Sequence, residues 1–163
     1  MQTARCATCG RPLDEHDRHV RFVMPDPVLD AGFQQGNPDL WMSGPNANES
    51  VMMEVRNLGA FVRALLPVRL SGGYSVTFGV WVAINPREIR RVFDVWWAPE
   101  YEQLVLEGYI ANDVMPWGLL GAPVTLRVRD VDQTPYCDSS DEGRLSHVLS
   151  AEWDHDEVLA SLP

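Results

Sequence analysis

The chain of 163 residues is 45% hydrophobic and 22% charged, and its formal net charge is −10. These values predict a single globular domain over residues 1–163 and argue against wholesale disorder. The excess of acidic residues argues against nucleic-acid binding, which needs a concentrated basic surface. No apolar run reaches the roughly 18 residues of a membrane span. The first residues also lack the features of a signal peptide, so we expect a cytoplasmic protein that enters no membrane.

Two cysteines near the start of the chain suggest a metal site. Cys6 and Cys9 are separated by two residues and followed by a glycine, as in zinc knuckles, where a small residue lets backbone N–H groups face the sulfurs. His16 and His19 are the nearest residues that could complete a four-ligand structural zinc site. Such a site would make residues 1–24 a zinc-knuckle-like segment with no open position for catalysis.

Alternatives to this set of ligands stay open. Cys137 or His147 could supply ligands from a distance, or the cysteines could be free thiols without metal. A redox pair is less favoured, because a redox-active C-x-x-C stands between a strand and the start of a helix. Here Pro12 and a charged stretch follow the motif instead.

A short strand and a long loop are expected next. Residues 20–24 alternate well enough for a strand, and two prolines close it. Residues 26–50 are rich in Pro, Gly, Asn and Asp, which predicts irregular surface with a short helix near Val28 and with Trp41 as an apolar anchor.

The clearest pattern is a strand, a turn and a second strand in the middle of the chain. Residues 61–70 predict a strand interrupted at Pro67, and the Ser-Gly-Gly of residues 71–73 supplies the turn. Alternate residues of 74–84 are apolar, so we expect one face of this strand to join the core. Trp81 lies on the other face, which we expect to be covered as well.

A helix with good start signals follows this strand. Asn85 can cap it, and Pro86 fits the first helical position. Four apolar residues recur at helical spacing and predict one core-facing stripe. The stripe consists of Ile89, Val92, Phe93 and Trp96.

The remainder of the chain predicts strands with short helices between them. A second short helix is expected before Gly108, a strand at 123–131 and an amphipathic closing helix at 154–162. Strands dominate and do not alternate regularly with helices. We therefore predict an α+β fold with a mostly antiparallel sheet and two or three helices.

The negative charge is concentrated near the end of the chain. Residues 130–163 hold nine acidic residues and one basic residue, Arg144. Asp138, Asp141 and Glu142 are candidates for a surface that meets a basic protein partner. The alternative is a solvated acidic loop that aids solubility. The run lacks the spacing of a calcium-binding loop.

An ordered series of short motifs links the chain to a known family. CATCG, FVRALLPV, FGVWVAI, GYIAND, VTLRVRDVDQTP and SHVLSAE follow one another between Cys6 and Glu152. With these motifs the chain resembles a bacterial family called domain of unknown function 2199. The resemblance implies a small cytoplasmic bacterial domain and supplies no activity. The segments 26–50 and 138–142 depart from the family pattern.

These patterns predict a non-enzymatic binding protein. One specific version is an immunity-like protein whose acidic surface neutralises a basic toxin. The alternative is a small-ligand binder or an enzyme that uses a groove around Arg63, Trp81 and Asn112, three residues on predicted sheet elements. A buried arginine paired with a carboxylate would give the same sequence pattern.

Overall fold

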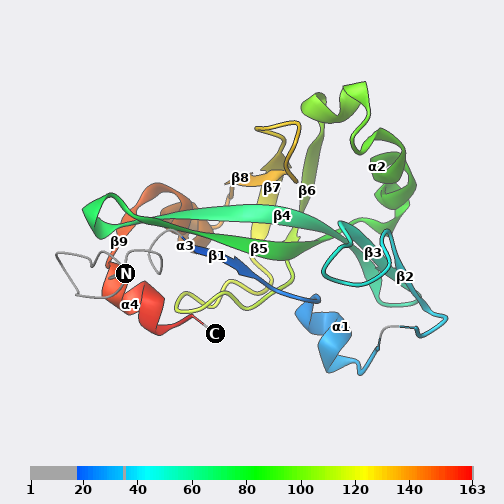
Figure 1. Cartoon of the computed structure of the whole chain (residues 1–163), viewed down its shortest axis with the longest axis horizontal. Helices are drawn as coiled ribbons and strands as arrows, with labels where there is room; N and C mark the ends of the chain where they lie inside the picture. Colours follow the sequence, from blue (N-terminus) through cyan, green and yellow to red (C-terminus); the bar gives the residue numbers. More distant parts are fainter. Residues whose placement is uncertain (1–17, 35, 163) are drawn as a thin grey trace, which may run out of the picture.

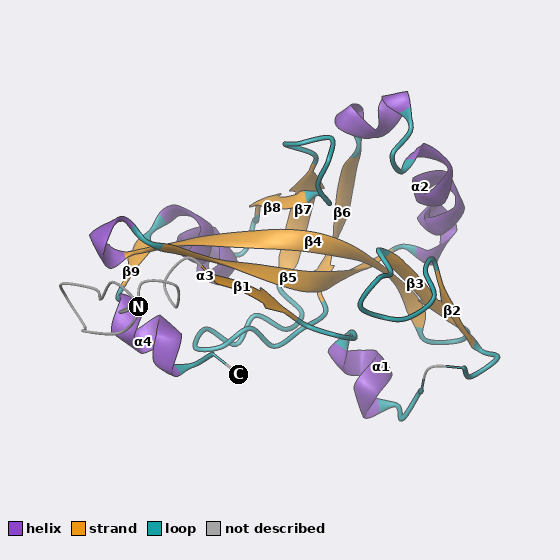
Figure 2. Ribbon diagram, viewed as in Figure 1, coloured by secondary structure: helices purple, strands orange, loops and turns teal. Residues whose placement is uncertain are grey.

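The computed structural model describes residues 18–34 and 36–162. Figure 1 shows a long ribbon of two strands, β4 and β5, crossed by β6 and β7, with β8 beside β7. The helices lie mainly toward the two ends of this ribbon (Figure 2). The strands are β1 (Arg18–Arg21), β2 (Leu40–Met42), β3 (Met52–Val55), β4 (Gly59–Leu70), β5 (Ser75–Ile84), β6 (Val105–Ile110), β7 (Pro123–Arg127), β8 (Tyr136–Ser139) and β9 (Glu152–Trp153). The helices are α1 (Asp26–Asp30), α2 (Ile89–Val95), α3 (Gly143–Ser150) and α4 (His155–Ala160), with 3₁₀ turns η2 (Ser71–Gly73), η3 (Pro86–Glu88) and η4 (Pro99–Gln103).

Five strands close into a barrel. β4, β5, β6, β7 and β8 each pair with the next in antiparallel fashion, and β8 returns to pair with β4. The closing pair is parallel, because an odd number of alternating strands leaves the first and the last pointing the same way. Closure rests on the pairing of Leu65 with Tyr136, where Leu65 N donates to Pro135 O at 2.8 Å.

The predicted α+β class with a simple antiparallel sheet is therefore wrong. The structure is mostly sheet, and only α2 and α3 among the described helices reach seven residues. The remaining strands extend the sheet beyond the barrel: β1 runs parallel to β5, β3 pairs with β4, β2 pairs with β3, and β9 pairs with β4.

Strand β4 runs unbroken through Pro67, so the predicted interruption is also wrong. The N–H groups of Arg63 and Leu65 point away from β5, toward Val51 O and Pro135 O. Alternation places the missing N–H of Pro67 on that same side. There β4 changes neighbour, from β8 at Leu65 to β9 at Arg69. The proline therefore costs no ladder bond.

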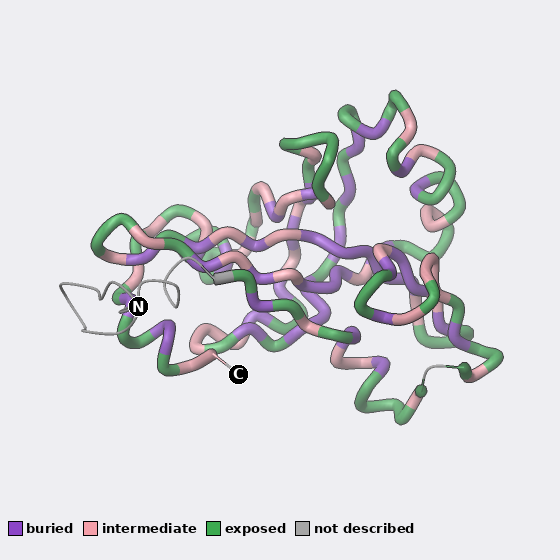
Figure 3. Tube along the Cα trace, in the orientation of Figure 1, coloured by how far each residue is buried: buried purple, intermediate pink, exposed green. Residues whose placement is uncertain are grey.

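Strand β5 has one face buried along its length, and its other face is covered at Trp81, as the sequence predicted. Val76, Phe78, Val80 and Val82 face the main core. Trp81 faces a second core, formed with α1, β2 and β3, which includes Val28 and Phe61 and covers the outer side of the sheet. Figure 3 shows that burial is densest along β4 and β5 and sparse at the outlying helices.

The predicted helix after β5 begins as expected and differs in its apolar stripe. Asn85 Oδ1 accepts from Arg87 N at 3.0 Å, so the capping residue is confirmed, and η3 leads into α2. Val92 and Trp96 are buried, whereas the side chain of Phe93 is 52% exposed. Phe93 packs edge-on against Trp41 of β2 with ring centroids 5.8 Å apart, and it therefore lies outside the core.

Other predicted elements shift in length. The segment 26–50 contains α1, the short helix expected near Val28, and also the strand β2, which was not expected. The strand expected at 123–131 ends at Arg127, and the closing helix α4 is capped by Asp154, whose side chain accepts from Glu157 N. None of the helices in the described part of the chain is both long and apolar enough to span a bilayer.

Candidate functional site

The three residues predicted to line a groove do come together, but they are buried. Arg63 is 2% exposed, and Trp81 and Asn112 are fully buried. The guanidinium carbon of Arg63 lies 4.2 Å from the centroid of the Trp81 ring, a cation–π distance.

The guanidinium of Arg63 is bound by backbone carbonyl oxygens. It donates to Val23 O at 3.2 Å, to Ala47 O at 3.1 Å, to Ser50 O at 3.4 Å and, at shorter range, to Phe22 O. Burial, and secondarily the nearby charge of Arg21, lower the pKa of Arg63 to about 9, which leaves it protonated at neutral pH. Arg63 is therefore a buried arginine, which was one of the alternatives. Its partners are backbone carbonyl groups and not the carboxylate that was expected.

Asn112 joins the same region through its amide group. Its Oδ1 accepts from Trp81 N at 2.7 Å, and its Nδ2 donates to Met24 O at 2.9 Å and to Asp26 Oδ1 at 3.1 Å. The second oxygen of Asp26 accepts from Asp113 N at 2.7 Å. These contacts fasten the segment after β1 to the sheet, so Arg63, Trp81 and Asn112 belong to the interior of the described structure.

The three acidic residues predicted to meet a partner differ in their surroundings. Asp138 lies 3.3 Å from Arg127 Nε and 3.2 Å from Arg129 Nη2, so it is shared by two arginines. Glu142 pairs with Arg144 at 3.2 Å. Asp141 is exposed and forms no ion pair with any described residue.

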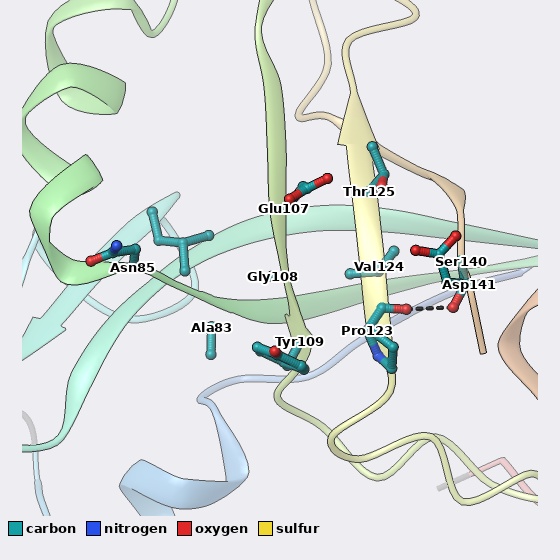
Figure 4. Close-up of a pocket in the computed structure, with 11 residues that line it drawn as sticks. Ala83, Asn85, Glu107, Gly108, Tyr109, Pro123, Val124, Thr125, Ser140 and Asp141 are labelled. Atoms are coloured by element: carbon teal, nitrogen blue, oxygen red, sulfur yellow. Dashed lines mark hydrogen bonds between the residues drawn. The ribbon is translucent and has the colours of Figure 1, made fainter.

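Asp141 lines a pocket of about 520 Å³ on the outer face of β5, β6 and β7. Figure 4 shows Tyr109 and Glu107 of β6 on one side, with Ser140 and Asp141 of the loop after β8 on the other. The ring of Tyr109 is 59% exposed. Ser140 Oγ donates to Pro123 O and so holds this loop against β7.

A second pocket, of about 700 Å³, lies where β6 begins and beside the loop after β7. Its walls include Trp97, which is 52% exposed, and Val131, and its carboxylates are Glu102 and Asp132. Trp97 has a φ of 64°, uncommon for a bulky residue, and its ring packs at 4.8 Å against Tyr101. The hydroxyl of Tyr101 donates to Gln133 O in the β7–β8 loop, and burial raises the pKa of Tyr101.

The two pockets have the same chemistry. Each combines an exposed aromatic ring with two carboxylates, and among the described residues no arginine or histidine lines either one. We call them the acidic pockets. The sequence analysis missed Glu102 and Glu107, although strict alternation of exposed and buried residues in β6 signals an outward face for Val105, Glu107 and Tyr109.

The predicted metal site falls largely outside the described part of the chain. Cys6, Cys9 and His16 lie outside the described residues, and His19 is an exposed residue of β1. The described residues contain no group of three or more His, Cys, Asp and Glu that could hold an ion. Zinc binding at the N-terminal cysteines therefore stays a prediction.

Cys137, considered above as a distant zinc ligand, is buried in the core, and burial raises the pKa of its thiol to about 12. Since the thiolate is the reactive form, we expect iodoacetamide to leave Cys137 unmodified in the folded protein at about pH 8 and to modify it in denaturant. Trypsin cleavage after Arg129 and Arg144 would isolate Cys137 in one peptide for mass spectrometry. Equal modification with and without denaturant would contradict this burial.

Comparison with known proteins places the chain in a family without adding an activity. No curated protein and no solved structure matches this chain. A family model described as "Uncharacterized protein conserved in bacteria (DUF2199)" matches residues 5–155. Because this match covers most of the chain, the protein belongs to the DUF2199 family of bacterial proteins, as its motifs predicted.

Proposed function

We propose that the protein is a non-enzymatic cytoplasmic binding protein that recognises a basic protein partner through its acidic pockets. The observation that carries this proposal is the pairing of exposed aromatic rings with unneutralised carboxylates at two places, one on β6 and β7 and one between η4 and the loop after β7. An immunity-like protein that neutralises a basic toxin is the specific version of this function.

The chemistry of the pockets suits arginine and lysine side chains. An arginine guanidinium can stack on the ring of Trp97 or Tyr109 while it donates to a neighbouring carboxylate, and such cation–π contacts contribute about 0.5–2 kcal/mol. The arginines of β7 do not compete for these carboxylates, because Arg127 and the neighbouring Arg129 are bound to Asp138.

A fluorescent octa-arginine peptide tests this proposal, with binding followed by anisotropy at about 50 mM and about 300 mM salt. We expect Glu102→Gln with Asp132→Asn to weaken binding about fivefold or more, because a charge partner of the peptide is lost. Glu107→Gln with Asp141→Asn should weaken it to a similar degree.

The matched control for these variants removes the same charge elsewhere. Glu152→Gln with Glu157→Gln changes two exposed acids near α4 and should alter the dissociation constant by less than about twofold. If this control weakens binding as much as the pocket variants do, the peptide responds only to net charge. That result would contradict the proposal.

A further inference from the structure

A different surface of the molecule carries exposed apolar side chains. Trp41 of the edge strand β2 is 42% exposed, and Phe93 of α2 is 52% exposed, with their rings in edge-on contact. Leu58, in the turn between β3 and β4, is 39% exposed nearby. Figure 1 shows β2 and α2 at the same end of the molecule. A cluster of exposed aromatic rings of this kind marks an interaction surface.

Two grooves flank Trp41 on this surface. One, of about 680 Å³, is lined by Asp39, Arg56 and Leu58, and the other, of about 500 Å³, is lined by Arg90, Phe93 and Asp94. Trp41 and Glu54 line both grooves, so the two are adjacent. We call this combined surface the Trp41 face.

The charges of the Trp41 face differ from those of the acidic pockets. Glu54 lines both grooves, and each groove adds one arginine, Arg56 or Arg90, and one aspartate, Asp39 or Asp94. None of these four side chains forms an ion pair with another described residue. The acidic pockets would repel a second copy of the chain, whereas the Trp41 face offers both signs of charge around an apolar centre.

We propose that the Trp41 face binds a second copy of this chain about a two-fold axis near Trp41. A two-fold interface brings the same patch of both copies together, so a patch must be complementary to itself. We place the axis across the line that joins the two grooves, so that the Arg56 groove of one copy lies against the Asp94 groove of the other. Arg56 then faces the partner's Asp94, Arg90 faces the partner's Asp39, and the rings of Trp41 and Phe93 are buried between them. This inference does not depend on the proposed binding of a basic partner.

Light scattering after size-exclusion chromatography tests this proposal. From about 1 µM to about 500 µM we expect the mass to rise from 18.3 kDa toward twice that value. Phe93→Asp should raise the dissociation constant of the dimer at least about tenfold, because it places a charge in the apolar centre. Tyr109→Asp is the matched control, because it places the same charge at an exposed ring of an acidic pocket. It should leave the dissociation constant of the dimer unchanged. A wild-type mass that stays at one chain over this range would overturn the proposal.

Charge reversal tests the axis without altering the apolar centre. Arg56→Glu alone and Asp94→Arg alone should each weaken the dimer, because like charges then meet across the interface. The double variant should recover most of the affinity, because the pair is restored with its signs exchanged. A dimer insensitive to both single variants, or a double variant weaker than either, would overturn the arrangement. The dissociation constant of the octa-arginine peptide should be the same in Arg56→Glu, Asp94→Arg and the double variant as in the wild type.

Discussion

Replacement of Arg63 by leucine is expected to lower the free energy of unfolding by roughly 3–5 kcal/mol. The guanidinium is 2% exposed, and it satisfies the carbonyl oxygens of Phe22, Val23, Ala47 and Ser50. Leucine would fill part of the space and remove the guanidinium donors. Val23 O would keep its bond from Trp81 Nε1 and Ala47 O its bond from Ser50 N, whereas Phe22 O and Ser50 O would each lose a donor. Denaturation in urea, followed by tryptophan fluorescence and by circular dichroism, would measure the loss.

Two comparison variants separate the hydrogen-bond network from the removal of a charge. Arg69→Leu changes an exposed arginine of the same strand, whose guanidinium donates to Ser150 O, and should cost less than about 1 kcal/mol. Arg63→Lys keeps the charge, but an ammonium cannot match the fork of donors that reaches five carbonyls, Gly79 O included, so most of the loss should remain. If Arg63→Leu lowers the free energy of unfolding no more than Arg69→Leu does, the buried hydrogen bonds of Arg63 do not stabilise the fold as proposed.

Replacement of Gly108 by alanine is expected to cost about 3 kcal/mol or more, because it forces two barrel strands apart. An added Cβ would lie 2.2 Å from Ala83 O and 2.8 Å from Val82 Cγ1, and the first of these is a backbone atom of β5. Gly108 pairs with Ile84 on one side and with Val124 on the other, so β6 cannot move away from β5 without disturbing β7. Thermal and urea unfolding of the purified variant would measure the effect.

Gly143→Ala is the matched control for this change. A Cβ at the first residue of α3 meets no atom within 4 Å, so the substitution should be neutral or stabilising by up to about 1 kcal/mol. A Gly108→Ala protein as stable as Gly143→Ala would contradict the close approach of β5 and β6.

Local features of the fold were predictable from the sequence. Alternation in β5 identified both its core face and the covered position of Trp81, and the chemistry of Asn85 identified a capping residue. These features depend on neighbours within a few residues. Phe93 shows the limit of the same method, because helical spacing placed it in the core while its ring rests on Trp41 of a distant strand.

Long-range features were not predictable in this way. Closure of the barrel depends on the meeting of Leu65 and Tyr136, which carry no pattern that distinguishes a closed sheet from an open one. The acidic pockets combine residues from several elements, such as Glu102 of η4 with Asp132 of the loop after β7. The sequence analysis placed the acidic surface near the end of the chain. There Asp138 forms ion pairs with Arg127 and Arg129.

The carbonyl contacts of Arg63 bear on which positions of this protein can vary. Carbonyl oxygens belong to every residue type, so Arg63 places no demand on the side chains of Val23 or Ala47. It demands only that two chain segments, 22–23 and 47–50, keep their backbones at a fixed distance from β4. The contacts with Arg63 would therefore survive substitutions in both segments, whereas insertions in either would disturb the other. Arg63 thus couples the lengths of two loops that are far apart in the sequence.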